Sequence, residues 1–236
     1  MLALERFDVP PVVDDDGIRV RARPLRAKES VVPPDWSSAS FWFQIAALAG
    51  AANGPARILL RDLHRDRWQG DEAACQLWKP WVRADSTPAG VLLVSERSPG
   101  FGDGRQELSF NLRNHPDLFQ PLALTCAALG QAARFTGLEN LPLKETDRIA
   151  AVIDTLGHFD IRPEVPENGF ILPFAEAPIR AAAGHVFNTF GDHRMAMGLA
   201  PLALRLAHLT LREPAVVAKS YPGFWEDIKK AGFGVG

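Results

Sequence analysis

Cysteine, lysine and long apolar runs are all scarce in this chain of 236 residues. Its two cysteines, Cys75 and Cys126, lie far apart and lack the paired spacing of disulfide frameworks or zinc sites. The histidines show no metal-binding spacing either, so we expect no metal and a reducing cytoplasm. The apolar segment 195–211 is interrupted by proline, arginine and histidine, and no signal-peptide stretch opens the chain. The sequence therefore predicts no membrane span.

The chain also has no excess of charge of one sign, since it contains 26 basic and 28 acidic residues. This balance gives no overall field for holding nucleic acid or an anionic membrane, and neither partner is expected. The hydrophobic share of 47% is typical of a globular protein. Length allows one large domain or two smaller ones.

Glycine and proline, 19 of each, divide the chain into short strands and helices of a mixed α/β pattern. Polar helix starts recur roughly 75 residues apart, which indicates a repeated unit whose copies pack together with their helix starts at one end. The apolar periodicity predicts helices over Ser37–Ala49, Asp71–Trp81, Asp117–Leu129, Glu145–Leu156, Asp192–Leu206 and Pro222–Ala231.

Near the N-terminus, residues 12–13 and 18–23 read as two strands joined by a turn over 14–17. Apolar residues from Ile18 onward alternate with three arginines. This alternation predicts a half-buried strand with a solvated arginine face.

Several helix starts carry cations, namely Lys144, Arg148, His193, Arg194 and Lys219. A cation there opposes the helix dipole at a cost of about 0.3–1 kcal/mol. An anionic ligand reverses that sign, because N–H groups and cations together favour phosphate or carboxylate. The pattern therefore suggests an anion site.

Carboxylates lie among these cations and could serve as a base and an acid for proton transfer. Asp117 opens one helix and Glu145 precedes another. A structural explanation stays open for each: Asp117 as a helix cap, Glu145 as the ion-pair partner of Arg148 three residues on. Likewise Asp192 can cap a helix while His193 and Arg194 simply face solvent.

Three strings resemble the signatures of the EPSP synthase (3-phosphoshikimate 1-carboxyvinyltransferase) family. They are Leu143–Arg148, Asn188–Met197 and Lys219–Pro222. Shorter matches follow the family's order at Asp35–Ser40, Gln69–Asp71 and His115–Asp117, so the resemblance spans nearly the whole chain.

The resemblance implies an α/β fold, the inverse α/β barrel of enolpyruvyl transferases, with two domains each built of three βαβαββ units. The family is normally about twice this length, and its amino-terminal phosphate-binding signatures are missing here. The chain therefore resembles the carboxy-terminal portion of a synthase. We expect a remnant of the first domain over residues 1–70 and most of the second over 71–236.

The implied reaction transfers the enolpyruvyl group of phosphoenolpyruvate to the 5-hydroxyl of shikimate 3-phosphate and releases phosphate, without metal or organic cofactor. By similarity Asp117 accepts the hydroxyl proton and Glu145 moves protons at the methylene carbon. The substrate-binding residues implied are Ser38, Asn140 and Lys144 for shikimate 3-phosphate, and Arg148, His193, Arg194 and Lys219 for phosphoenolpyruvate.

One local departure is Phe41, where the family commonly has tyrosine, which removes a hydroxyl contact to the sugar phosphate. Because half of the anion contacts are missing, we expect negligible activity from this chain alone. Activity would then require a separate amino-terminal half. Two alternatives stay open: a non-catalytic anion-binding or interaction module, and a relative of the UDP-N-acetylglucosamine enolpyruvyl transferases, against which the quoted strings argue.

Overall fold

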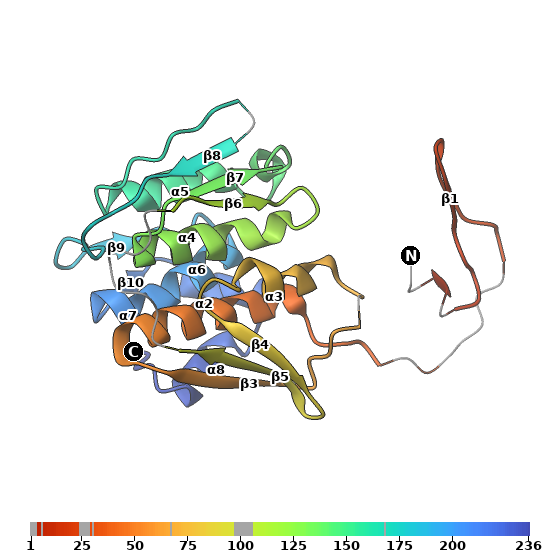
Figure 1. Ribbon diagram of the computed structural model, residues 1–236, viewed down its shortest axis with the longest axis horizontal. Helices are drawn as coiled ribbons and strands as arrows, with labels where there is room; N and C mark the ends of the chain where they lie inside the picture. The colour runs from red at the N-terminus through yellow and green to blue at the C-terminus, as the bar shows by residue number, and fades with distance from the viewer. Residues whose placement is uncertain are drawn as a thin grey trace.

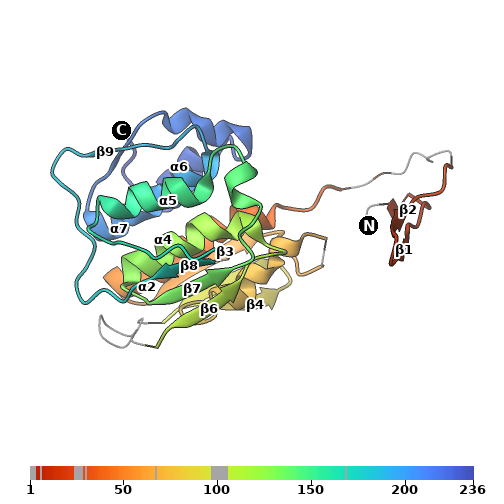
Figure 2. The same ribbon diagram turned by 90° about the horizontal axis from the view of Figure 1, so that it is seen from above.

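The computed structural model describes residues 4–5, 7–23, 29, 31–66, 68–96, 106–167 and 169–236. One compact body begins at Trp36 and runs to the C-terminus. A small antiparallel hairpin of β1 (Val12–Asp14) and β2 (Gly17–Arg19) stands apart from this body in both views (Figures 1 and 2).

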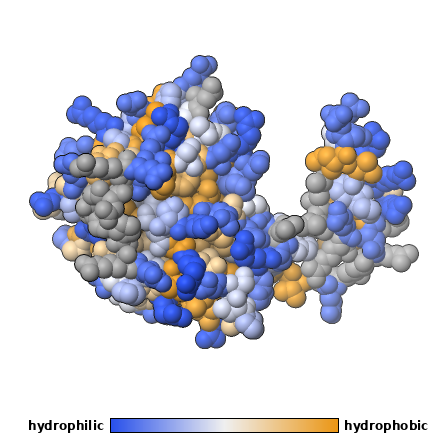
Figure 3. Space-filling view, in the orientation of Figure 1, coloured by the Kyte–Doolittle hydropathy of each residue, from blue (hydrophilic) through white to orange (hydrophobic). Residues whose placement is uncertain are grey.

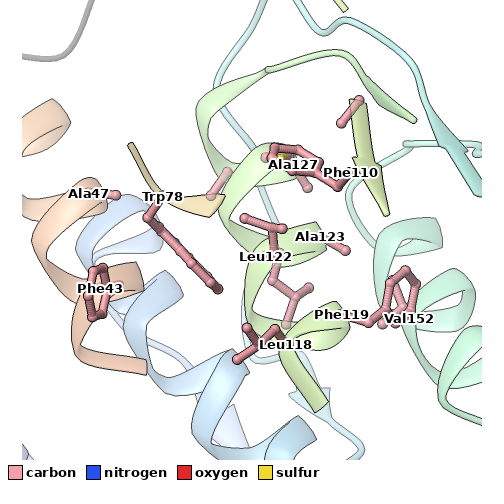
Figure 4. Close-up of a cluster of buried hydrophobic side chains, with 14 of the residues drawn as sticks. Phe43, Ala47, Trp78, Phe110, Leu118, Phe119, Leu122, Ala123, Ala127 and Val152 are labelled. Carbon is pink, nitrogen blue, oxygen red and sulfur yellow. The ribbon is translucent and has the colours of Figure 1, made fainter. Parts of the chain in front are cut away.

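Three helices form the centre of the body and contact one another: α2 (Trp36–Asn53), α4 (Phe119–Leu129) and α6 (His193–Leu199). Helix α4 is buried on every side except at its last residue, and its central position explains why its sequence is apolar all round. Figure 4 shows its labelled side chains between Trp78 on one side and Val152 on the other. These helices hold the main hydrophobic core.

Three small sheets and three outer helices surround the central helices. The sheets have the orders β3-β5-β4, β6-β7-β8 and β10-β9. The strands are β3 (Ala56–Arg61), β4 (Arg83–Thr87), β5 (Gly90–Ser95), β6 (Leu108–Asn111), β7 (Ala133–Thr136), β8 (Gly169–Leu172), β9 (Val186–Phe187) and β10 (Thr210–Leu211). The outer helices are α3 (Ala74–Leu77), α5 (Arg148–Gly157) and α8 (Phe224–Lys230).

Short helical turns complete the body: η1 (Gly70–Ala73), η2 (Pro116–Leu118), η3 (Leu141–Leu143), η4 (Ala200–Leu202), α7 (Ala203–Leu206) and η5 (Pro214–Lys219).

The same unit recurs three times, with a central helix, a strand and an outer helix, and in the first two copies further strands follow within the described residues. The second copy is complete: β6, α4, β7 and α5 lead to a single bridge at Glu164 and then to β8, with Glu164 paired to Ile171. This order is βαβαββ. The mixed α/β fold expected from the sequence is confirmed.

Aspartates begin the helices that position the site. Asp35 accepts hydrogen bonds from the N–H groups of Ser37 and Ser38, and Asp147 does the same for α5. Asp192 accepts one from the N–H of Arg194 at the start of α6. At the other end of α4, Gly130 ends the helix with φ of 67°, a left-handed conformation that glycine adopts without steric cost.

Two predicted helices are shorter than expected, and proline explains both. The helix predicted over Asp71–Trp81 is reduced to η1 and the single turn α3, because Pro80 disfavours helical geometry at the residue before it. The helix predicted over Asp192–Leu206 is divided into α6, η4 and α7 around Pro201, which has no N–H to continue the helical ladder.

The domain boundary expected at residue 70 does not coincide with any break in packing. Strand β3 precedes that position and pairs along its whole length with β5, which follows it. One hydrophobic core extends from Trp36 to Leu202. The break in packing lies before Trp36 instead.

The hairpin also differs from expectation, because nothing covers its apolar face among the described residues. Ile18 is 65% exposed and Val20 is 48% exposed, so the strand is not half-buried. Figure 3 shows this apolar surface in orange on the part of the molecule that stands apart.

Candidate active site

The starts of the second and third units meet at one end of the central helices. Asp117 in η2 precedes α4, Arg148 opens α5, and Asp192 and Arg194 open α6. Lys144 lies at the end of η3 just before α5. The predicted gathering of polar helix starts is therefore found for these elements.

Asp117 is the centre of the group. Its Oδ1 lies 2.7 Å from Nη1 of Arg148 and 3.5 Å from Nζ of Lys144. Its Oδ2 accepts a hydrogen bond from Nη2 of Arg194 at 2.8 Å. Three cations from two stretches of the sequence thus converge on one carboxylate, whereas the helix cap expected as the structural alternative is not made.

Arg148 joins the carboxylates of three elements although its side chain is only 1% exposed. Besides Asp117, it donates from Nη2 to Glu145 at 2.7 Å and from Nε to the fully buried Asp192 at 2.9 Å. The expected pairing of Glu145 with Arg148 is present, but as part of this larger network. We call Asp117, Lys144, Glu145, Arg148, Asp192 and Arg194 the Asp117 cluster.

The pKa values follow from burial and charge. Burial raises the pKa of Asp117, but Arg194, Arg148 and Lys144 outweigh it and hold the pKa below its usual value. Burial lowers the pKa of Arg148, and Asp192 with Asp117 more than compensates. Both groups are therefore charged at neutral pH.

His193 and Arg194 are largely buried, which contradicts the alternative in which they face solvent. Burial first, and then the charge of Arg194, lower the pKa of His193, so its imidazole is neutral at pH 7. Nδ1 of His193 and Nε of Arg194 are buried without a hydrogen-bond partner among the described residues. Such atoms remain for a ligand to satisfy.

Lys219 belongs to the same region without joining the ion pairs. Its Nζ donates to the carbonyl of Gly191, two residues before His193, at 3.2 Å, and its side chain is exposed. Asn140 is exposed at the start of η3, in the segment that also carries Lys144.

Ser38, another predicted site residue, lies in the first turn of α2. Its hydroxyl donates to Asp35 at 2.5 Å, and it lines a cavity with Tyr221 and Trp42. Phe41, expected to mark a lost ligand contact, is fully buried against Phe224 with ring centroids 6.4 Å apart. Phe41 belongs to an apolar cluster that also contains Phe224 and Ile228.

A second polar network, which the sequence analysis missed, continues from the cluster toward α2. Asp71 is buried and accepts a short hydrogen bond from the Ser37 hydroxyl, and His115 Nδ1 lies 4.0 Å from the Asp71 carboxylate. Burial dominates here and raises the pKa of Asp71. The sequence did contain a signal for Asp71, because an acidic residue recurs at each polar helix start.

Asp192 and Gln120 are the other residues that sequence reasoning missed. Asp192 was expected only as a cap, yet it also pairs with Arg148 and accepts from Nε2 of Gln120 at 3.2 Å. No local pattern marks Gln120, because its partner lies in another unit.

Within the described ranges, no group of three or more histidine, cysteine, aspartate or glutamate side chains is arranged to hold a metal ion. The donors present are cationic and suit an anion instead. Nor does any helix in these ranges combine the length and apolarity needed to cross a membrane.

Comparison with known proteins identifies the family of this chain. A model of the family described as EPSP synthase (3-phosphoshikimate 1-carboxyvinyltransferase) matches residues 3–228. The chain belongs to the EPSP synthase family. The expected family is thereby confirmed.

Curated relatives carry the same name. A 3-phosphoshikimate 1-carboxyvinyltransferase of Bacteroides fragilis strain YCH46 is 38% identical over 225 residues, which are 94% of this chain and 52% of the relative. One from Pyrococcus abyssi is 30% identical, covering 91% of this chain and 48% of the relative. The chain thus spans about half the length of the curated relatives it matches.

Solved structures agree on the fold. EPSP synthase from Acinetobacter baumannii superposes with a TM-score of 0.74 at 23% identity, covering 97% of this chain and 53% of that one. The enolpyruvyl transferase NikO of Streptomyces tendae gives a TM-score of 0.63 at 17% identity, covering 98% and 52%. Both likenesses support the enolpyruvyl transferase fold expected from the sequence.

Proposed function

We propose that this chain supplies the carboxy-terminal half of a 3-phosphoshikimate 1-carboxyvinyltransferase. The reaction joins the enolpyruvyl group of phosphoenolpyruvate to the 5-hydroxyl of shikimate 3-phosphate and releases phosphate. The observation that carries the proposal is the convergence of Lys144, Arg148 and Arg194 on Asp117. Both substrates are anions of the class that such a cluster recognises.

The cations bind the carboxylates of the protein when substrate is absent and bind the substrate when it is present. Without substrate, Asp117 and Glu145 occupy the guanidinium groups of Arg148 and Arg194. A substrate phosphate or carboxylate that takes those N–H groups releases both carboxylates. Loss of the ion pairs raises the pKa of Asp117 toward the range of an effective base.

Asp117 then accepts the proton of the attacking 5-hydroxyl. Glu145 delivers a proton to the methylene carbon during addition and removes one during elimination. Arg148, His193, Arg194 and Lys219 hold phosphoenolpyruvate and stabilise the negative charge of the tetrahedral intermediate. Asn140 and Lys144 hold the shikimate ring.

The role expected for Ser38 has weaker support. Its hydroxyl is already bonded to Asp35, and it lines a cavity that Ser220 and Tyr221 also border. We keep it as a phosphate contact only for the assembled enzyme, in which another segment would border that cavity.

The remaining anion contacts must come from an amino-terminal half, so the chain alone is expected to turn over negligibly. Deleting one partner of a buried charge pair already costs about 2–5 kcal/mol.

The test is complementation. The chain is co-expressed with the amino-terminal half of the Bacteroides fragilis relative, and phosphate release is measured with both substrates and with each alone. Release that requires both substrates and both halves is expected. Binding of shikimate 3-phosphate without any release would instead favour the anion-binding module, and no binding at all would contradict both functions.

A further inference from the structure

Gln120 is a fully buried amide in the largely apolar helix α4. It lies three positions after Asp117, about one helical turn further into the body. Its Nε2 donates to Oδ2 of Asp192 at 3.2 Å. Its Oε1 is buried and has no hydrogen-bond partner among the described residues. The side chain therefore gives a donor to Asp192 while its acceptor stays unsatisfied.

This half-satisfied amide is unfavourable for stability, because buried polar groups normally find partners. Thr125 in the same helix shows the usual case: its hydroxyl donates to the carbonyl of Pro121 at 2.6 Å and accepts from Nε1 of Trp78 at 3.2 Å. Methionine would fill a similar volume at position 120 without burying an amide. The donation to Asp192 is therefore what distinguishes Gln120 from an apolar residue in its place.

Asp192 receives donors from three helices although it is fully buried. Its Oδ2 accepts from Gln120 in α4 and from Nε of Arg148 in α5, the latter at 2.9 Å. Its Oδ1 accepts from the backbone N–H of Arg194 in α6 at 2.7 Å. The orientation of this carboxylate is thus set jointly by the three helices.

The orientation of Asp192 matters for Arg148 because a guanidinium is planar, so the position of Nε fixes where the other two nitrogens point. Those nitrogens meet the partly exposed carboxylates of Asp117 and Glu145, whereas the bond to Asp192 is buried. In the proposed function a substrate anion takes the two outer nitrogens. The bond to Asp192 is then the contact that still holds the guanidinium.

We propose that Gln120 is a positioning residue for phosphoenolpyruvate binding, which acts on Arg148 through Asp192. Its donor holds Oδ2 of Asp192 where Nε of Arg148 meets it. Without this bond the carboxylate gains freedom to turn, the guanidinium turns with it, and binding of a phosphate or carboxylate weakens. The inference rests on the proposed function, because that function supplies the anion that Arg148 binds.

Gln44 offers a matched control, since it is a second fully buried glutamine with the same bonding. Its Nε2 donates to the carbonyl of Gly198 in α6 at 2.9 Å, and its Oε1 also lacks a partner among the described residues. Gln120→Met and Gln44→Met each remove one buried amide donor, so we expect comparable losses of stability. Only Gln120→Met removes a donor from Asp192, so only this variant should affect Arg148.

The first measurement is hydrogen exchange at the Nε–H of Arg148 in the full chain alone, followed by nuclear magnetic resonance. The rate is divided by that of the backbone N–H of Ala151, which donates to the carbonyl of Asp147 in α5, so that general opening of the helix cancels. We expect Gln120→Met to raise this ratio about tenfold and Gln44→Met to leave it nearly unchanged. Equal ratios in the two variants overturn the proposal.

The second measurement is steady-state kinetics of the enzyme co-expressed with the amino-terminal half of the Bacteroides fragilis relative. Gln120→Met should raise the KM for phosphoenolpyruvate about tenfold, which is more than it lowers kcat, because it disturbs an anion contact and leaves the proton-transfer groups in place. Gln44→Met should leave the KM unchanged. An unchanged KM in Gln120→Met, or an equal rise in both variants, contradicts the positioning role.

The two readouts separate this inference from the proposed function. Faster exchange at Arg148 in Gln120→Met, with no phosphate release from the unsubstituted co-expressed enzyme, supports the action of Gln120 on Arg148 and contradicts the function. Phosphate release with exchange and KM both unchanged in Gln120→Met supports the function and overturns this inference. If Gln120→Met does not fold, Gln120→Asn replaces it, since asparagine withdraws the donor from Asp192 by one methylene group; the same results are expected and the same results overturn the proposal.

Discussion

Arg148 and Asp192 form an ion pair that solvent does not reach, with Nε of Arg148 2.9 Å from Oδ2 of Asp192 and side chains 1% and 0% exposed. The same carboxylate accepts from the backbone N–H of Arg194 at 2.7 Å. One buried aspartate therefore fixes the guanidinium of Arg148 and the first turn of α6. Its charge stabilises the position of both arginines before any substrate arrives.

Replacing Asp192 should therefore destabilise the fold. Asp192→Asn keeps a capping oxygen for α6 but leaves the buried charge of Arg148 without its only fully buried carboxylate partner among the described ion pairs. We expect a loss of about 3 kcal/mol in the free energy of unfolding, measured by urea denaturation. Asp147→Asn is the control: Asp147 caps α5 from an exposed position, and asparagine caps nearly as well, so the loss should stay under about 0.5 kcal/mol. Similar losses in both variants would contradict the proposed role.

Asp117 should add a pH-dependent contribution to stability. Its pKa lies below the usual 3.8, so its contribution is present above that value and is lost as pH falls through the lower pKa of the folded state. Asp117→Asn should lower the urea midpoint at pH 6, and the difference from the unchanged chain should shrink toward pH 2.5. Glu139→Gln, at an exposed pair with Arg113, should give a small difference. A difference for Asp117→Asn that is constant with pH would refute the ion-pair origin.

Several residues of the Asp117 cluster could be predicted because the sequence next to them identifies them as helix starts. Cations at helix starts oppose the dipole, and that conflict indicated Lys144, Arg148 and Arg194, which the structure brings together at Asp117. The burial of Arg148 was not predictable, since its partner Asp192 lies 44 positions away in another unit.

In the fold, too, features set by neighbouring residues could be predicted, whereas features set by contacts between distant segments could not. Helices α2 and α4 were predicted near their observed bounds because their apolar residues mark them locally, and Asp35 caps α2. The strand order β3-β5-β4 was not, because pairing across residue 70 depends on contacts between distant segments. Strands β3 and β5, which lie on the two sides of residue 70 in the sequence, pair along the whole length of β3.

Glu145 offers a test of catalysis distinct from binding. Glu145→Gln retains an acceptor for Arg148 but cannot exchange a proton at the methylene carbon. In the co-expressed enzyme we expect turnover to fall by about 10²–10⁴-fold, with substrate KM changing far less, measured by phosphate release. Glu139→Gln, on the exposed surface, should leave both quantities unchanged. Normal turnover in Glu145→Gln would remove the residue from the proton-transfer role.

Arg194 should instead control binding of phosphoenolpyruvate. Its Nη2 bonds Asp117, while its Nε is buried without a partner among the described residues and is available to an anion. Arg194→Ala should raise the KM for phosphoenolpyruvate by at least about 30-fold, equivalent to about 2 kcal/mol, in the co-expressed enzyme.

The conservative substitution distinguishes charge from geometry at the same position. Arg194→Lys keeps the charge but loses the planar fork that grips a phosphate or carboxylate with two N–H groups, so only partial recovery of the KM is expected. Arg113→Ala is the matched control, because Arg113 is 71% exposed and paired only with Glu139 among the described ion pairs. An unchanged KM in Arg194→Ala would take the residue out of the anion site, and the convergence on Asp117 would then have to be explained by stability alone.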